Sequence, residues 1–229
     1  MATPATNSRT QRGLSLIELM VGLAIGLFIT AIGGSLLASH VRENRSLLLE
    51  ARLMQDLRTA ADVITRDLRR AGYWGGAGSG VWSAGATGIV TNPYAAVAPD
   101  SAASDAVSFR YSRDTTENNA LDSNEQFGFR LRNGTIEMLL GGSGWQALTD
   151  AGTLTVSAFS VTPRVERIDL QGSCSKPCPV GSTTCPPQQE VRSLALLISG
   201  RSATDANVTR SVRSQVRLRN DSFTGACPV

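Results

Sequence analysis

The chain has 229 residues, of which 41% are hydrophobic and 18% charged, a composition that excludes a disordered acidic or basic tail. It carries 22 basic and 19 acidic residues, and the formal charge of +3 is too small to indicate a nucleic-acid surface by itself. The length allows one ordinary domain with an appendage, or two small domains.

The first predicted element is an apolar helix close to the amino terminus, at residues 14–37. Its only polar residues are Ser15, Glu18, Thr30 and Ser35. At 1.5 Å per residue the segment is about 36 Å long, which is enough to cross a hydrocarbon core of about 30 Å. The sequence therefore predicts a membrane-spanning helix.

Two common interpretations of such a helix are incomplete. A cleaved secretory signal has an apolar region of about 7–15 residues and a small-residue cleavage site, whereas this run is longer and residues 36–40 offer no good site. A simple membrane anchor agrees with the charges, because Arg9 and Arg12 precede the run and a polar body follows it. The simple anchor does not explain Glu18. Burying its charge near the membrane centre would cost roughly 2–3 kcal/mol, and less near the cytoplasmic edge.

A third interpretation accounts for the glycine, the carboxylate and the apolar run together. Residues 12–18, RGLSLIE, resemble the leader and cleavage site of type IV prepilins, although that family more often has Phe where this chain has Leu14. In that family a peptidase cuts after the glycine, the new amino terminus is N-methylated, and the apolar segment forms the filament core. The resemblance implies cleavage between Gly13 and Leu14, methylation of Leu14, and an assembly role for Glu18. Its carboxylate would pair with the amine of a neighbouring subunit, so that the two charges partly cancel.

The helix is predicted to continue beyond the membrane segment as an amphipathic helix. Apolar residues recur there at spacings of three and four, which places them in one stripe on a helix. The stripe residues are Leu53, Leu57, Ala61, Ile64, Leu68 and Ala71. The helix should stop near Gly72, because the segment that follows contains too many glycines to continue it.

Beyond Gly80 the hydrophobic period changes from 3.6 to 2, which predicts strands. Asn133-Gly134 lies between two alternating runs and is a strong hairpin signal, because both residues accept positive φ. The predicted strands are residues 106–111, 127–132, 135–139, 153–159, 190–198 and 213–219. Short strands with turn-rich links predict an antiparallel sheet that needs a cover on one face, and the helix stripe is the obvious cover.

This order of elements predicts the α+β fold of a type IV pilin, a long amino-terminal helix packed on a carboxyl-terminal antiparallel sheet. Three further stretches, with the Asn133-Gly134 hairpin, resemble the PilW group of type IV minor pilins. They are residues 67–73 (DLRRAGY), 145–150 (WQALTD) and 216–220 (VRLRN). The predicted parts are a leader (1–13), a transmembrane and filament-core helix (14–37), its amphipathic continuation (38–72), and a periplasmic sheet domain (73–229).

The resemblance implies a low-abundance subunit that joins other minor pilins in a complex that starts the pilus and sits at its tip. It implies prepilin peptidase as the processing enzyme, and other minor pilins, the major pilin and a tip adhesin as partners. The chain would first cross the inner membrane once, with the amino terminus cytoplasmic and the body periplasmic, and would then enter the pilus fibre. The alternatives are a J-type pseudopilin of type II secretion and a membrane-anchored periplasmic binding module outside any filament.

All four cysteines lie in the last quarter of the chain. They are Cys174, Cys178, Cys185 and Cys227. Zinc would favour a paired C-x2-C spacing, which is absent, and an oxidising periplasm favours disulfides. We expect Cys227 to tether the tail to the loop at residues 172–189, leaving one local bridge, although the spacing does not settle the pairing. A loop of that length is a candidate contact surface.

Catalysis has little support. The only histidine, His40, lies just beyond the membrane segment, where it is unsuited to a Ser-His-Asp or Cys-His arrangement. No phosphate loop or H-E-x-x-H string occurs. Asp122 and Glu125 indicate a polar loop, or at most a weak cation site. We therefore expect no catalytic residue, no resident metal, no cofactor and no direct nucleic-acid binding.

Overall fold

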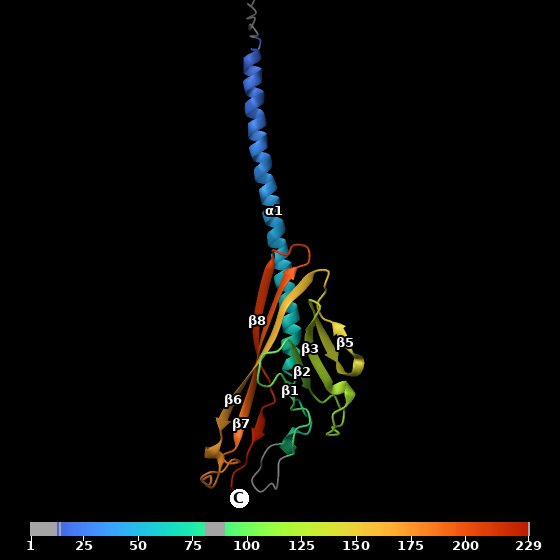
Figure 1. Ribbon diagram of the computed structural model, residues 1–229, viewed down its shortest axis with the longest axis vertical. Coiled ribbons are helices and arrows are strands. Elements are labelled where there is room, and N and C mark those ends of the chain that lie inside the picture. Colours follow the sequence, from blue (N-terminus) through green and yellow to red (C-terminus); the bar gives the residue numbers. More distant parts are fainter. Residues whose placement is uncertain (1–12, 14, 81–89, 229) are drawn as a thin grey trace, which may run out of the picture. The chain divides into compact units, whose positions relative to one another are not determined.

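The computed structural model describes Gly13, residues 15–80 and residues 90–228 (Figure 1). The elements, in chain order, are α1 (Leu16–Leu68), η1 (Ala77–Gly80), β1 (Val97–Ala98), β2 (Ala106–Arg110), η2 (Ser123–Glu125), β3 (Gln126–Arg132), β4 (Thr135–Leu140), η3 (Gly141–Ser143), β5 (Trp145–Ala147), β6 (Leu154–Asp169), η4 (Gln171–Ser173), β7 (Gln188–Ser202), β8 (Thr209–Arg217) and β9 (Ser222–Thr224). The chain divides into two compact units, the first ending at Leu48 and the second beginning at Leu49. The second unit contains the last part of α1 and all the strands named above.

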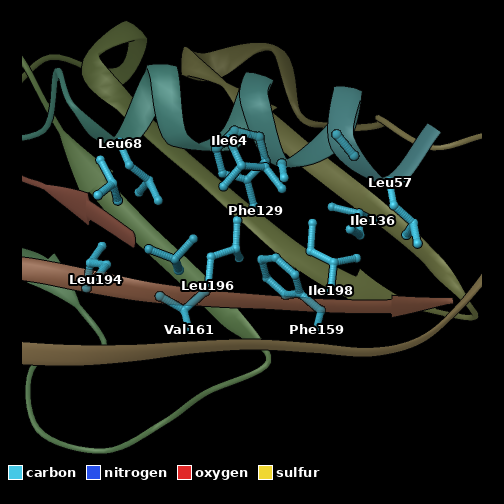
Figure 2. Close-up of a cluster of buried hydrophobic side chains, with 14 of the residues drawn as sticks. Leu57, Ile64, Leu68, Phe129, Ile136, Phe159, Val161, Leu194, Leu196 and Ile198 are labelled. Atoms are coloured by element: carbon cyan, nitrogen blue, oxygen red, sulfur yellow. The ribbon is translucent and has the colours of Figure 1, made fainter. Parts of the chain in front are cut away.

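The apolar stripe on α1 forms one wall of the core of the second unit. Every stripe residue predicted from the spacing is buried, and Leu57, Ile64 and Leu68 are fully so. Figure 2 shows these three side chains facing residues from the strands, among them Phe129 and Phe159. Burying a Leu or Ile side chain contributes about 1.5–3 kcal/mol relative to leaving it exposed, so the stripe attaches this part of the helix to the strands.

The α-helix stops at Leu68, one turn before the glycine-rich segment predicted to end it. Gly72 has a φ of +73°, a left-handed conformation that glycine adopts without strain. A Cβ at this position would lie 3.4 Å from the Cβ of Asn220. The amide of Gly72 donates a hydrogen bond of 2.7 Å to the carbonyl of Arg110, which joins the end of the helix to strand β2.

Strands β1 to β5 form the first sheet, in which each strand pairs antiparallel with the next. Asn133 and Gly134 have φ values of 51° and 75°, so the predicted Asn-Gly turn between β3 and β4 is confirmed. Three phenylalanines face the core from β2 and β3, with the Phe109 ring 5.8 Å from that of Phe127 and 6.1 Å from that of Phe129.

Strands β6, β7 and β8 form the second sheet, and β9 pairs with the beginning of β7. In Figure 1, β6 and β7 run beside each other as one long hairpin. Alternate residues of these strands are buried, including Val161, its cross-strand neighbour Leu196, and Ile198. This face supplies the other wall of the core seen in Figure 2.

The α+β class and the antiparallel pairing predicted from the sequence are confirmed, but the strands form two sheets instead of one. The first sheet ends at β5, and β6 begins a new one after a turn at residues 148–153. An isolated bridge between Ser104 and Val161 and a 2.8 Å hydrogen bond from the Val156 amide to the Gly134 carbonyl join the two sheets. Alternation predicts strands but carries no information on which strands pair.

The boundaries between the predicted parts of the chain stay predictions. They are residue 13 for the leader, residue 37 for the transmembrane helix and residue 72 for its amphipathic continuation.

Strands β6 and β7 also extend further than their hydrophobic alternation predicted. The sequence indicated 153–159 and 190–198, whereas the strands contain 16 and 15 residues. Residues 164–169 of β6 are exposed, so this part has no buried face that would produce an apolar–polar alternation. It is held by ladder pairing and by polar contacts such as the Arg167–Glu190 ion pair, whose N···O distance is 2.9 Å.

Candidate assembly surface

The predicted processing site lies immediately before α1. Gly13 and Ser15 are non-helical and α1 begins at Leu16, whereas Leu14 lies outside the described residues. Glu18 is in the first turn, and its Oε2 accepts a hydrogen bond of 3.2 Å from the Ser15 amide. A carboxylate at this position satisfies a free amide and interacts favourably with the helix dipole. It also has further lone pairs, which leaves the predicted pairing with a neighbour's amine chemically available.

The helix that follows Glu18 exposes a continuous apolar surface. Large apolar residues more than two-fifths exposed occur on every turn from Leu16 to Leu37, and Leu16 itself is 79% exposed. Among the described residues, α1 is the one helix long and apolar enough to cross a membrane. No other part of the described chain covers its most apolar stretch. Such a surface needs an apolar environment, which lipid or other subunits would supply.

Two hydroxyl groups within the apolar part of α1, those of Thr30 and Ser35, bind the helix backbone. Thr30 donates to the carbonyls of Gly26 (3.0 Å) and Leu27 (2.9 Å), and Ser35 donates to the carbonyl of Ile32 (2.8 Å). Because these polar groups are satisfied within the helix, they cost little in an apolar environment. Glu18 is therefore the polar side chain of the apolar part of α1, residues 16–37, with most capacity for an external partner.

The four cysteines form two disulfide bonds, Cys174–Cys227 and Cys178–Cys185. The first connects the β6–β7 loop with the carboxyl-terminal tail, and the second closes a short loop within it. The Cys174, Cys178 and Cys185 sulfur atoms lie within 4.8 Å of one another, a spacing that could also hold a metal ion. Each sulfur is bonded to another in this structure, so none is a thiolate able to bind a metal.

The loop that carries Cys174, Cys178 and Cys185 is open to solvent. Most of residues 171–184 are exposed, and the Val180 side chain is fully so. Strand β9 lies beside it and places Phe223, 39% exposed, opposite Gln189 of β7. The loop predicted to contact a partner therefore carries the exposed Val180 on a scaffold closed by two disulfides, and β9 adds the exposed Phe223 next to it.

A polar network after the end of α1 was not predicted from the sequence. The Glu117 carboxylate accepts hydrogen bonds from the Gly75 amide (2.9 Å), the Asn119 amide (3.0 Å) and the Tyr94 hydroxyl (3.0 Å). The Trp74 indole donates to the Asn119 side chain at 2.8 Å. This network orders the loop that connects β2 to β3 against the segment that follows α1.

The hydrogen bonds in this network change the acidity of its members. Burial raises the pKa of the Glu117 carboxyl, but hydrogen bonds from Ser112, Asn119, Gly75 and Tyr94 outweigh that effect and the net pKa is lowered. Burial and the hydrogen bond to Glu117 raise the pKa of the Tyr94 hydroxyl far above its usual value. The carboxylate is thus held ionised and the phenol neutral.

Glu125, considered with Asp122 as at most a weak cation site, has a different role. Its carboxylate is fully buried and accepts the Arg113 and Asp122 amides, each at 2.8 Å. With Asp122 it forms a capping box that begins the short helix η2. The Asp-x-x-Glu spacing indicates this capping box in the sequence. Gly75 and Tyr94, which donate to Glu117, are distant from it in sequence, so no local pattern predicts that network.

Two protein-family models match the chain. The model of the prokaryotic N-terminal methylation motif matches residues 8–34, which include Gly13 and Glu18. The model described as prepilin peptidase-dependent protein B matches residues 46–218, which is well over half of the chain. No curated protein and no solved structure matches the chain.

Proposed function

Since the chain belongs to the prepilin peptidase-dependent protein B family and carries the prokaryotic N-terminal methylation motif, we propose that it is a minor pilin of a type IV pilus, similar to the PilW group. Its fold is the α+β, type IV pilin-like fold. The family and motif give the chain a pilin-like role in assembling a pilus or pseudopilus, with processing by prepilin peptidase. The type IV pilus and a place in a tip complex that starts the filament are the proposed refinements.

The observation that carries the proposal is the exposed apolar surface of α1, which begins at Leu16, three residues after the motif glycine, Gly13. Cleavage after Gly13 on the cytoplasmic side would leave the whole apolar helix attached to the mature chain. Lipid would cover this surface before assembly, and the helices of neighbouring subunits would cover it in a filament. Glu18 would then pair with the new amine of a neighbour, where both charges lose part of their desolvation cost.

The proposed role is structural, without catalytic turnover. The chain would span the inner membrane once with its body in the periplasm, and would then move into the pilus fibre. Its partners would be other minor pilins, the major pilin and possible tip adhesins. The exposed loop closed by Cys178–Cys185 is the proposed contact region for such a partner.

Mass spectrometry of the mature amino terminus tests the processing step. The chain is isolated from membranes of its native host, with and without an active prepilin peptidase. The proposal predicts a terminal peptide that begins with N-methylated Leu14 only where the peptidase is active. An intact leader in both strains would contradict the proposal and favour the membrane-anchored binding module.

Deletion of the gene distinguishes a pilus from a secretion system, because J-type pseudopilins share the cleavage motif and the helix. The deletion strain is scored for surface pili and twitching motility and, separately, for secretion of exoproteins. The proposal predicts loss of pili and twitching with normal secretion. Normal twitching with defective secretion would contradict the minor pilin proposal and favour a J-type pseudopilin.

A further inference from the structure

A pocket lies at the carboxyl end of α1, within the second unit. Its volume is about 350 Å³, and the residues that line it include three arginines and two tyrosines: Arg69, Arg70, Arg219, Tyr73 and Tyr111. Arg69, Arg70 and Tyr73 follow the last helical residue, Tyr111 follows β2, and Arg219 follows β8. Three segments distant in sequence thus bring three cations and two aromatic rings to one cavity, called here the arginine pocket.

The three guanidinium groups have no acidic partner among the residues that the structure describes. Elsewhere the chain pairs arginines with carboxylates, for example Arg130 with Glu137 at 2.7 Å and Arg217 with Asp221 at 2.8 Å. Within the described ranges, 13, 15–80 and 90–228, none of the three pocket arginines has an ion-pair partner or a side-chain hydrogen bond.

Two neighbouring groups act on the charges of the pocket, but neither neutralises an arginine. The guanidinium of Arg70 lies over the Tyr111 ring, 4.4 Å from its centroid. Asp67 is close enough to act on the Tyr111 hydroxyl, but its nearest cation is Arg66 at 3.8 Å, outside the pocket lining. The cavity therefore keeps a cationic character.

The walls of the pocket are fixed by hydrogen bonds to the backbone. The Asn220 side chain donates to the carbonyl of Ala71 at 2.9 Å, and the Ser112 amide donates to the carbonyl of Tyr73 at 2.9 Å. These bonds join the segment after β8 and the end of β2 to the turn that follows α1. A site whose walls are already fixed loses less conformational entropy when it binds a ligand.

Stabilisation of the helix end explains only part of this arrangement. Cations in the last turn interact favourably with the helix dipole, and this accounts for Arg69 and Arg70. The helix dipole does not account for Arg219, which lies near the carboxyl terminus of the chain. It also does not account for Tyr73, whose side chain is 53% exposed beside the arginines. Exposed Tyr and Arg side chains gathered at one place are typical of protein interaction hot spots.

We propose that the arginine pocket binds a carboxylate side chain from an acidic segment of a partner protein. Guanidinium groups bind carboxylates through paired hydrogen bonds, and Tyr73 offers an apolar wall for the stem of the acidic residue. A nucleic acid would require a longer basic stripe, whereas Asp67 adjoins these arginines and the pocket is confined. That the partner is another pilus subunit rests on the proposed function; the recognition chemistry does not.

The test uses the full chain in detergent micelles and fluorescence anisotropy of labelled probes. The probes are a capped peptide of alternating Glu and Ser, the same peptide with Gln in place of Glu, and an oligothymidylate of equal charge. We expect the Glu peptide to bind, the Gln peptide not to bind, and the oligothymidylate to bind at least tenfold more weakly than the Glu peptide. Equal binding of both peptides, or preferred binding of the oligothymidylate, would overturn the proposal.

Matched variants locate the site. Arg70→Gln and Arg219→Gln should each weaken binding of the Glu peptide by at least tenfold, while Arg70→Lys should weaken it less. Arg213→Gln makes the same charge change at an exposed position of β8 outside the pocket and should leave binding unchanged. Equal losses in all three Gln variants would indicate a general charge effect and contradict the site. Circular dichroism confirms that each variant is folded.

This result is independent of the proposed function. If the chain is processed and enters pili but the Glu peptide does not bind, only the arginine pocket proposal fails. If the peptide binds but the leader stays intact, the pocket proposal holds and the minor pilin proposal fails.

Discussion

Glu18 binds the residue that precedes its own helix and is proposed to bind a neighbouring subunit as well. The first interaction is the 3.2 Å hydrogen bond from the Ser15 amide. It needs an acceptor oxygen and no charge, whereas pairing with a neighbour's amine needs the negative charge. Glutamine at this position keeps an acceptor without the charge, and alanine removes both.

We therefore expect Glu18→Gln and Glu18→Ala to leave membrane insertion and cleavage intact and to reduce incorporation into filaments by about tenfold or more. A charged hydrogen bond contributes about 1.5–3 kcal/mol, and about 1.4 kcal/mol corresponds to a factor of ten. The readout is the ratio of the chain in sheared filaments to the chain in membranes. Normal incorporation of the Gln variant would show that the bond to Ser15 suffices and would exclude the charge pairing.

Glu117 provides a second prediction at the scale of a residue. Since hydrogen bonds lower its pKa in the folded chain, its contribution to stability is complete above about pH 4.3, the ordinary value for a glutamate, and is lost as the pH falls through the lower folded-state pKa. Glu117→Gln should reduce the free energy of unfolding by about 1–3 kcal/mol at pH 7 and by less in acid.

Chemical denaturation of the variant and the parent chain at several pH values measures this difference. Glu166→Gln is the matched control, because it makes the same change at an exposed position of β6, away from the Glu117 network. A Glu117→Gln loss that stayed constant from pH 7 to pH 3 would contradict the ionised network.

At the scale of elements, the stripe of α1 and the two sheets share one core. Ile64 is fully buried at the centre of the stripe and faces both sheets (Figure 2). Ile64→Ala should therefore lower the free energy of unfolding by about 2–5 kcal/mol, through lost burial and the cavity left behind. Arg58→Ala, on the exposed side of the same helix, should change it by less than about 0.5 kcal/mol. Similar small losses in both variants, measured by denaturation, would contradict the shared core.

The two disulfides should contribute unequally, because they close loops of different length. The residues joined by Cys174–Cys227 are 53 positions apart and those joined by Cys178–Cys185 are 7 apart. The chain-entropy relation gives about 4 kcal/mol for the first and about 2 kcal/mol for the second. Replacing each pair by serine and comparing the free energies of unfolding tests this order, and a larger loss for the short loop would contradict it.

How far the sequence predicts each element depends on whether its signal is local. The stripe on α1 and the Asn133-Gly134 turn follow from spacing and φ preference, so both were predictable. The division into two sheets depends on strand pairing, which local alternation does not encode. The same holds for the candidate sites: the motif around Gly13 and Glu18 is contiguous, whereas the arginine pocket joins Arg70 to Arg219 across most of the chain.

At the scale of the whole molecule, two features serve different steps of the proposed assembly. The exposed apolar helix and Glu18 would place the chain in a membrane and then in a filament. The sheet domain, with the disulfide-closed loop and the arginine pocket, would supply contacts to specific neighbours. Both features fit the proposed place at the start of a filament.

The most direct measurement is therefore where the chain lies in purified pili, and in what amount. Pili sheared from cells are separated by length, and the chain is quantified against the major pilin and labelled with gold for electron microscopy. We predict a constant number of copies per fibre at every length, with label confined to one end. Copies that increased in proportion to length, or a chain found only in the membrane fraction, would contradict it.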